Sequence, residues 1–276
     1  MMHCNLKGLT TLTTLTTLAL LAIVLASCST SPTGRSQLVL KSEAALAAEG
    51  QRQFNMIREQ MPMVKDRGTI DYVACVADAI VGELESDDAA MFWELAVIDQ
   101  PDINAFVMPG GKISVFSGIL TVAQTQHQLA AVIGHEVAHV TARHANERAS
   151  RASVTSAGVD VAAILLGGGY SRPTYGAQQT LGAGVALGIL NPFSRMQETE
   201  ADVIGLEYMA KAGFDPRESV TLWKNMEEKN TTRVPEFMST HPSGDKRIES
   251  LVSQFPTALA YYNEAQAKGK NPDCKR

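Results

Sequence analysis

Residues 128–144 read QLAAVIGHEVAHVTARH, and they give the strongest structural signal in this chain. Most of its positions are apolar, which predicts a helix buried on nearly all sides. Thr125 and Gln128 form a capping-box pattern, so we expect the helix to begin after Thr125 and to run to about His144. Polar side chains inside such a helix need partners that offset the cost of burial.

Two histidines and a glutamate of this helix have the spacing of a zinc site. His135 and His139 are four residues apart, so both can present a ring nitrogen to one metal ion. Glu136 is rotated by about 100° around the helix and reaches the open side, where a metal-bound water would lie. The alternative is a purely structural role, with a pair of hydrogen-bonded histidines and a surface glutamate. The pattern favours a catalytic zinc ion, provided that a third ligand exists.

A second capped helix offers that ligand. Ser194 and Gln197 form another capping box, and the helix is expected to end at Gly213. Glu198 and Asp202 are four apart on one face of it. Glu198 can bind the metal while Asp202 accepts the free ring N–H of a ligating histidine. Two histidines, one glutamate and an exchangeable position make a catalytic arrangement.

Other polar residues nearby are weaker candidates. A third histidine of the extended HExxHxxGxxH pattern is missing, because Ala142 and Ala145 stand at the two decisive positions. We expect His144 on the surface, His127 in a structural role and Glu200 pointing away from the metal.

The rest of the chain predicts an α+β fold that is mostly helical. Helical periodicity covers residues 43–60 and 70–84, and β-rich runs follow at 92–99, 103–108 and 112–116. Turn signals separate these runs, so they predict a small sheet. Later helices are expected after Asp215-Pro216 and, from Ser243, through Gln254.

The boundaries of one main domain follow from this organisation. Residues 43–262 form the expected domain, and 263–276 form a C-terminal tail. Residues 154–190, within the domain, are rich in glycine and hold two apolar pieces of about ten residues, too short to span a membrane. They predict either a helical hairpin that lies over the domain and can touch lipid, or a plain buried hairpin.

Composition limits the function classes. The 276 residues carry 24 Lys+Arg against 29 Asp+Glu, for a net charge of −5, with 45% hydrophobic residues. Such a chain can bury a large core and has no basic footprint for nucleic acid. We therefore expect no nucleic-acid partner, and the oligomeric state stays open.

The N-terminus predicts export. Leu18 to Ala26 are nine apolar residues, as in a signal peptide and too few for a membrane span. Leu25-Ala26-Ser27-Cys28 resembles the bacterial lipobox, in which the cysteine thiol receives the lipid. Residues 1–27 are then a signal peptide, and 28–42 a lipidated tether that anchors the chain to a membrane. By resemblance to Gram-negative sorting, Ser29 favours the outer membrane.

Four motifs occur together between residues 104 and 248. They are NAFVMPGG (104–111), GHEVAH (134–139), SRMQETEAD (194–202) and THPSGDKRI (240–248). In this order the chain resembles the HtpX and Ste-type gluzincin zinc metallopeptidases. Within that family it is similar to short periplasmic lipoproteins of the LoiP kind and to Oma-type proteases. The resemblance implies a zincin-like fold with an edge strand ahead of the HExxH helix.

The resemblance also implies site residues. One Zn²⁺ per chain is held by His135, His139 and Glu198, with Asp202 behind a histidine. His241 matches a position that acts as transition-state donor or as latent fourth ligand, and Arg247 is a further candidate donor to the oxyanion. The strand expected to pair with an extended substrate consists of Asn104, Ala105, Phe106 and Val107.

The implied function is a zinc metalloendopeptidase in the bacterial envelope, facing the periplasm from the outer membrane. It would cleave misfolded or damaged envelope proteins, with Glu136 as general base toward a zinc-activated water. Two alternatives stay open. One is a chaperone-like or scaffolding lipoprotein with a structural zinc ion. The other is a latent protease held shut by His241 or by the glycine-rich hairpin.

The cysteines predict one disulfide. Cys4 leaves with the signal peptide and Cys28 carries lipid, which leaves Cys75 and Cys274. In an oxidising periplasm these two can form a bridge from the tail to the second helix. The alternative is a buried Cys75 with a free thiol in the tail.

Overall fold

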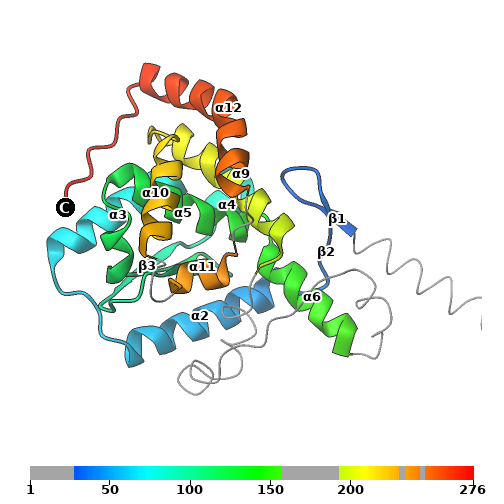
Figure 1. Ribbon diagram of the computed structural model, residues 1–276. Coiled ribbons are helices and arrows are strands. Elements are labelled where there is room, and N and C mark those ends of the chain that lie inside the picture. The colour runs from blue at the N-terminus through cyan, green and yellow to red at the C-terminus, as the bar shows by residue number, and fades with distance from the viewer. Residues whose placement is uncertain (1–27, 157–192, 230–233, 243–245) are drawn as a thin grey trace, which may run out of the picture.

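The computed structural model describes residues 28–156, 193–229, 234–242 and 246–276. The fold is α+β and mostly helical, as the sequence predicts (Figure 1). The strands are β1 (Cys28–Thr30), β2 (Ser36–Leu38), β3 (Glu94–Ile98), β4 (Ala105–Met108) and β5 (Lys112–Phe116). The helices are α2 (Glu43–Gln60), α3 (Arg67–Val81), α4 (Ser86–Ala89), α5 (Gln126–Thr141), α6 (His144–Ser156), α9 (Arg195–Lys211), α10 (Glu218–Lys229), α11 (Glu236–Thr240) and α12 (Arg247–Ala267), with a short 3₁₀ helix at Ser117–Thr121.

The central sheet has three strands in the order β3-β5-β4. β5 lies in the middle, parallel to β3 and antiparallel to β4. The turn from β4 to β5 contains Gly110 and Gly111, both at positive φ (84° and 75°), which glycine adopts without strain. β4 therefore lies at one edge of this sheet, and it precedes the HExxH helix in the chain.

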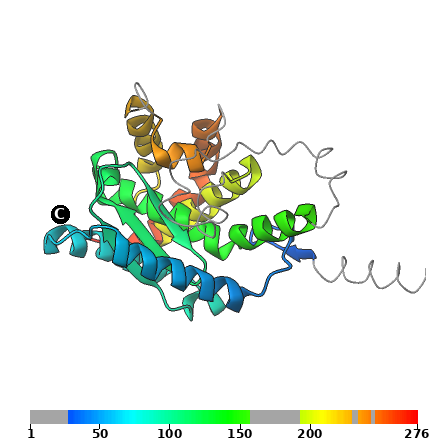
Figure 2. The ribbon, with the colours of Figure 1, turned by 90° about the horizontal axis from the view of Figure 1, so that it is seen from below.

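Strand alternation divides the core into two layers. On one face, Phe54 and Ile57 of α2 pack against Ile98, Met108 and Phe116. On the other face, side chains such as Val97, Ile113 and Val115 join the larger core formed with the helices. Figures 1 and 2 show α2 along one side of the sheet and α5, α9, α10 and α12 on the other. α5 thus packs between the central sheet and α9.

The backbones of α5 and α9 meet at two glycines. A Cβ atom at Gly205 would lie 2.7 Å from the backbone nitrogen of His135, and one at Gly134 would lie 2.8 Å from the carbonyl oxygen of Gly205. No side chain fits at either position without moving backbone. The close approach therefore brings the metal-binding faces of the two helices together.

The HExxH helix ends earlier than expected. α5 stops at Thr141, Ala142 caps it, and Arg143 takes a left-handed conformation (φ 57°). A new helix, α6, begins at His144. The chain changes direction at Arg143, so the position of His144 cannot be extrapolated from the axis of α5.

The last helix is longer than expected. We predicted an end at Gln254, but α12 continues to Ala267 with Pro256 inside it. Proline removes one intrahelical hydrogen bond and bends a helix without always ending it. α12 changes direction along its length (Figure 1).

Residues 28–42, expected to act as a tether, include an antiparallel hairpin of β1 and β2 in which Cys28 pairs with Leu38. Arg35, beside the turn, forms ion pairs of 2.8 Å with Glu147 of α6 and with Glu200 of α9. The hairpin is thus folded onto the helices next to α5. The predicted signal peptide lies outside the described residues, and so does most of the glycine-rich segment.

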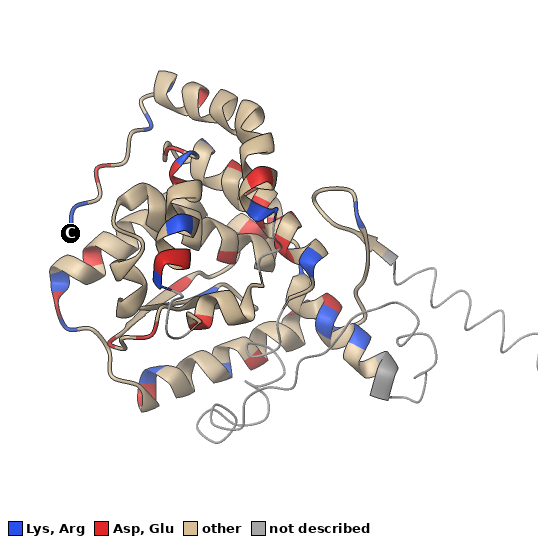
Figure 3. Ribbon diagram, viewed as in Figure 1, with Lys and Arg blue, Asp and Glu red and all other residues tan. Residues whose placement is uncertain are grey.

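Basic and acidic residues are interspersed along the elements (Figure 3). Within the described part of the chain, none of the helices combines the length and the apolar character needed to cross a bilayer.

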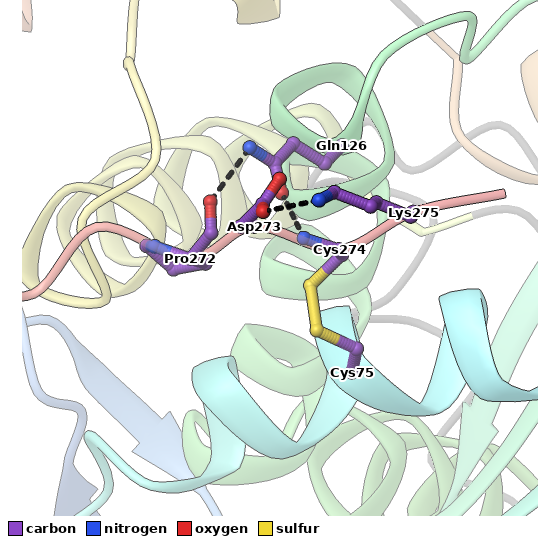
Figure 4. The surroundings of a disulfide bond; sticks show 6 residues. All are labelled: Cys75, Gln126, Pro272, Asp273, Cys274 and Lys275. Atoms are coloured by element: carbon purple, nitrogen blue, oxygen red, sulfur yellow. Dashed lines mark hydrogen bonds and ion pairs between the residues drawn. A yellow bond between two sulfur atoms is a disulfide. The ribbon is translucent and has the colours of Figure 1, made fainter.

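A disulfide joins the C-terminal tail to α3. The sulfur atoms of Cys75 and Cys274 are bonded, with 5.7 Å between the two Cα atoms (Figure 4). Gln126, the first residue of α5, holds the same tail: its side chain donates to the Pro272 carbonyl and accepts from the Cys274 N–H, each at 2.8 Å. The bridge therefore holds the tail against both α3 and the start of α5.

Replacing both cysteines with serine should lower the free energy of unfolding. The bridge spans 199 residues. Loops of this size contribute roughly 5 kcal/mol in the chain-entropy model, and removing a native disulfide typically costs 2–5 kcal/mol. Urea unfolding of the Cys75→Ser/Cys274→Ser variant measures the loss. A reductant should lower the unfolding midpoint of the wild type and leave the variant unchanged, and equal midpoints for both proteins would contradict the prediction.

Candidate metal centre

Four side chains from three elements converge on one point. His135 and His139 come from α5, Glu198 from α9, and His241 follows α11. Each offers one ligand atom, and these atoms lie within 4.8 Å of one another. All four side chains are buried. The structure therefore brings together the four residues that the sequence singled out around the metal.

The distances fit a tetrahedral zinc ion. The Nε2 atoms of His135 and His139 are 3.1 Å apart, and Nδ1 of His241 lies 3.2 Å from Nε2 of His135. The Glu198 carboxylate lies 3.1 Å from His241, 3.3 Å from His135 and 3.5 Å from His139. Donor atoms about 2.0–2.1 Å from a tetrahedral zinc ion are roughly 3.3 Å apart. Three nitrogens and a carboxylate are also donors that zinc accepts, so the residues fit the ion.

Asp202 fixes the orientation of His135. Its Oδ1 atom lies 3.0 Å from Nδ1 of His135, so the carboxylate accepts that ring N–H and leaves Nε2 with a free lone pair. Arg247 donates to the same oxygen at 2.6 Å, and its guanidinium lies 3.6 Å above the Trp223 ring. Arg247 is therefore engaged behind the ligand, where it orients Asp202.

His144 is buried, so our prediction of a surface residue was wrong. Its side chain has no exposed area, because the break at Arg143 redirects the chain into the core. Nδ1 of His144 lies 2.8 Å from Nδ1 of His139. Nε2 of His144 lies 3.1 Å from Glu200, which points away from the metal as expected. His127 has a structural contact: it accepts a hydrogen bond from the Asp215 N–H.

An aromatic side chain covers His139. The ring of Phe193, the residue before the cap of α9, stacks on the His139 ring with 3.7 Å between centroids. Arg148 of α6 lies 3.6 Å over the other side of the phenylalanine. Phe193 thus holds the imidazole in place. No local pattern in the sequence points to this contact, because the two rings belong to different parts of the chain.

Glu136 lies beside the cluster and next to β4. The residue is 2% exposed. Burial raises the pKa of its carboxyl above the ordinary value, and His241, His135 and the backbone of Val107 in β4 oppose this rise. Its Oε1 atom lies 3.2 Å from Nε2 of His241. That contact lacks hydrogen-bond geometry, and Oε1 has no hydrogen-bond partner among the described residues. The site therefore contains a buried carboxylate whose free oxygen can accept a proton.

The electrostatics of the cluster favour a cation. Burial opposes a positive charge on His135, but the hydrogen bonds to Asp202 and Glu198 outweigh it and raise the pKa of this histidine to about 9. The two carboxylates thus favour a positive charge at this position, which a bound metal ion would supply in place of the second ring proton. Burial also lowers the pKa of His139 well below its usual range, so this ring is neutral, as a metal ligand must be. The pKa of Glu198 is lowered, because His241 and His135 outweigh its burial.

The remaining predicted residues are those of the substrate strand and the lipidated cysteine. Asn104 immediately precedes β4, and Ala105, Phe106 and Val107 form most of this edge strand. Cys28 begins β1, far in the sequence from the cluster. The sequence reasoning missed the contacts of Arg35 and Phe193 and misplaced His144.

Comparisons of the sequence with known proteins find similarity to metalloendopeptidases. The chain is 40% identical over 207 residues to the mitochondrial metalloendopeptidase OMA1 of Schizosaccharomyces pombe, covering 74% of this chain and 56% of that protein. Human mitochondrial metalloendopeptidase OMA1 is 32% identical over 240 residues, covering 82% and 45%. The beta-barrel assembly-enhancing protease of Yersinia pestis is 28% identical over 207 residues, covering 73% and 42%. The chain thus spans about half the length of these relatives.

A family model covers the segments that contribute all four residues of the cluster. The sequence model of peptidase family M48 matches residues 70–254, a range that includes the sheet, α5, α9 and His241. This match extends over more than half of the chain. The chain therefore belongs to peptidase family M48.

Proposed function

We propose that this protein is a zinc-dependent metalloendopeptidase, anchored as a lipoprotein in the bacterial envelope, that cleaves misfolded or damaged envelope proteins. The observation that carries the proposal is the convergence of His135, His139 and Glu198 beside the buried carboxylate of Glu136. Family membership and the OMA1-type relatives support the same reaction class.

The proposed chemistry divides between the ion and the chain. His135, His139 and Glu198 would hold the zinc ion, which when bound would supply Lewis-acid polarisation of the scissile carbonyl. Glu136 acts as general base: it takes a proton from the attacking water and passes it to the leaving amine, a role worth about 10²–10⁴-fold in rate. Burial raises the pKa of Glu136, which brings the carboxyl closer to the range in which one group both accepts and returns a proton.

Strand β4 supports the proposed use of extended polypeptide. It lies at the edge of the sheet and its Val107 backbone faces Glu136. An edge strand can pair with a peptide through backbone hydrogen bonds, largely independent of the peptide's sequence. Residues Asn104 to Val107 would in this way lay the scissile bond beside the general base.

The proposed location rests on the sequence and on the redox chemistry. The lipobox-like residues before Cys28 favour a lipid anchor of the LoiP kind, and Ser29 favours the outer membrane. The Cys75–Cys274 disulfide suits an oxidising compartment such as the periplasm. One of the relatives is named a beta-barrel assembly-enhancing protease, which agrees with substrates in the envelope.

His241 favours a latent form of this enzyme. Its Nδ1 atom is the fourth donor of the cluster, and its Nε2 atom lies 3.2 Å from Glu136. A site with four protein ligands has no exchangeable position. In the proposed latent state, His241 occupies the place that substrate needs and must leave it before cleavage.

Exchange of the general base should separate chemistry from metal binding. Glu136→Gln should retain zinc and lose at least about 10²-fold in casein cleavage, because the amide cannot accept the proton. Glu198→Ala should lose both cleavage and zinc. Metal content measured by atomic absorption therefore distinguishes Glu198→Ala from Glu136→Gln. Full metal content in Glu198→Ala would contradict the ligand assignment. If the wild type and His241→Ala both hold zinc but neither cleaves casein, the result would favour the scaffolding alternative.

Removal of the fourth donor should activate the protein. His241→Ala should keep zinc through the three remaining ligands and cleave casein faster than the wild type at equal zinc content. Equal or slower cleavage would contradict latency and leave His241 as a group needed for turnover.

Loss of the acylated thiol should release the protein from the membrane. Cys28→Ala, expressed in a Gram-negative host, should appear in the soluble periplasmic fraction without lipid, whereas the wild type should fractionate with the outer membrane. Mass spectrometry of the N-terminal peptide and sucrose-gradient fractionation measure both. Unchanged membrane fractionation of the variant would refute the anchor.

A further inference from the structure

The two ligating histidines of α5 are held in different ways. Nδ1 of His135 contacts the carboxylate of Asp202 directly at 3.0 Å. Nδ1 of His139 contacts a second imidazole instead, that of His144, at 2.8 Å. His139 faces the other donors of the cluster through Nε2, which needs a free lone pair to bind a metal, so the ring proton must be on Nδ1. His139 can bind zinc in this way only if Nδ1 of His144 accepts that proton's hydrogen bond.

Glu200 sets the tautomer of His144. Its carboxylate lies 3.1 Å from Nε2 of His144, and an ionised carboxylate can only accept. Nε2 of His144 must then carry the ring proton, which leaves the lone pair on Nδ1. His139 donates its Nδ1–H to that lone pair, and its Nε2 atom faces the metal donors at 3.1–3.5 Å. The hydrogen bonds have only this one consistent direction when His139 is a ligand.

Arg35 holds Glu200 in place. Its Nε donates to Oε2 of Glu200 at 2.8 Å, and Thr33 of the same turn donates to Oε1 at 2.5 Å. The other guanidinium nitrogens of Arg35 bind both oxygens of Glu147, at 2.9 and 2.8 Å. Arg35 thus fixes two buried carboxylates with one planar fork, a geometry that lysine cannot reproduce.

The same pattern occurs behind His135, the other histidine of α5 in the cluster. There Arg247 donates to Asp202 at 2.6 Å, and Asp202 accepts from His135. Each ligating histidine of α5 therefore has its own carboxylate, and each carboxylate has its own arginine. The difference is that the His139 branch contains one more imidazole and ends on the N-terminal hairpin rather than on α12.

We propose that Arg35, Glu200 and His144 are positioning residues for zinc binding by His139, so that the N-terminal hairpin is part of the metal site. The proposal rests on the proposed function, because it needs His139 to be a zinc ligand. It extends that function by making metal affinity depend on a segment that begins at Cys28. Partners of ligating histidines typically contribute 10–100-fold to metal affinity or activity.

Zinc affinity measured against a competing chelator tests the proposal on the full-length mature chain. Arg35→Gln and His144→Phe should each raise the zinc Kd by about 10–100-fold. His144→Gln should recover most of this loss, because its amide offers one acceptor and one donor in place of Nδ1 and Nε2–H. With Co²⁺ as probe, the two disruptive variants should shift the visible absorption bands and the rescued variant should not.

Arg151→Gln is the matched control. Arg151 forms an ion pair with the same Glu147 at 2.7 Å, but its side chain is half exposed. Its loss should leave the zinc Kd and the Co²⁺ spectrum unchanged. Circular dichroism identifies any variant that does not fold. Arg35→Gln leaves the buried carboxylates of Glu147 and Glu200 without this partner, so its unfolding midpoint in urea is measured beside its zinc Kd and only a folded variant is compared.

The outcomes separate the two proposals. If the wild type binds zinc and both disruptive variants bind it equally well with an unchanged Co²⁺ spectrum, the positioning role is overturned and the proposed function stands. Equal losses in Arg35→Gln and Arg151→Gln would also overturn it, since they would indicate a general effect on α6. A wild type that binds no zinc would overturn the proposed function and this inference together.

Discussion

The backbone contact between α5 and α9 is the constraint on which the metal centre depends. Helices usually pack 8–10 Å apart, with the spacing set by the side chains between them. Gly134 and Gly205 remove those side chains at the crossing. Gly205 lies three residues after Asp202 and seven after Glu198, on the same face of α9. Gly134 directly precedes His135. The crossing thus sets how far the carboxylates of one helix reach toward the imidazoles of the other.

Burial of so many polar groups around the cluster is tolerated because most of them have a specific partner, the free oxygen of Glu136 being an exception. Breaking one partner of a buried ion pair leaves an uncompensated charge and is strongly destabilising. Around the cluster, arginines neutralise carboxylates and carboxylates orient imidazoles, while Phe193 and Trp223 close the sides. The contacts that orient the ligands are therefore also the contacts that compensate the charges buried in the core. Catalytic geometry and stability share the same residues.

The sequence predicted what depends on local spacing. His135 and His139, and likewise Glu198 and Asp202, follow the helical repeat, and the caps at Thr125 and Ser194 accept hydrogen bonds as expected.

What the sequence could not predict depends on a break or on distance along the chain. His144 was misplaced because one left-handed residue, Arg143, ends the helix whose axis was extrapolated. The contact of Arg35 with Glu200 joins residues 165 positions apart, and no local pattern encodes it. The turn signal at Gly110-Gly111 agrees with the pairing of β4 with β5, but no local pattern indicates that β3 pairs with β5 in parallel.

If Cys28 carries a lipid as proposed, the N-terminal hairpin also limits how far the catalytic centre can lie from that anchor. Arg35 is bound to Glu147 and Glu200 only seven residues after Cys28. Even a fully extended chain of that length spans no more than about 25 Å, and here part of it is folded back on itself. With a lipid on Cys28, the catalytic centre would be confined to a shallow layer above the bilayer. Polypeptides that emerge at the membrane surface would be within its range, and those deep in the periplasm would have to come to it.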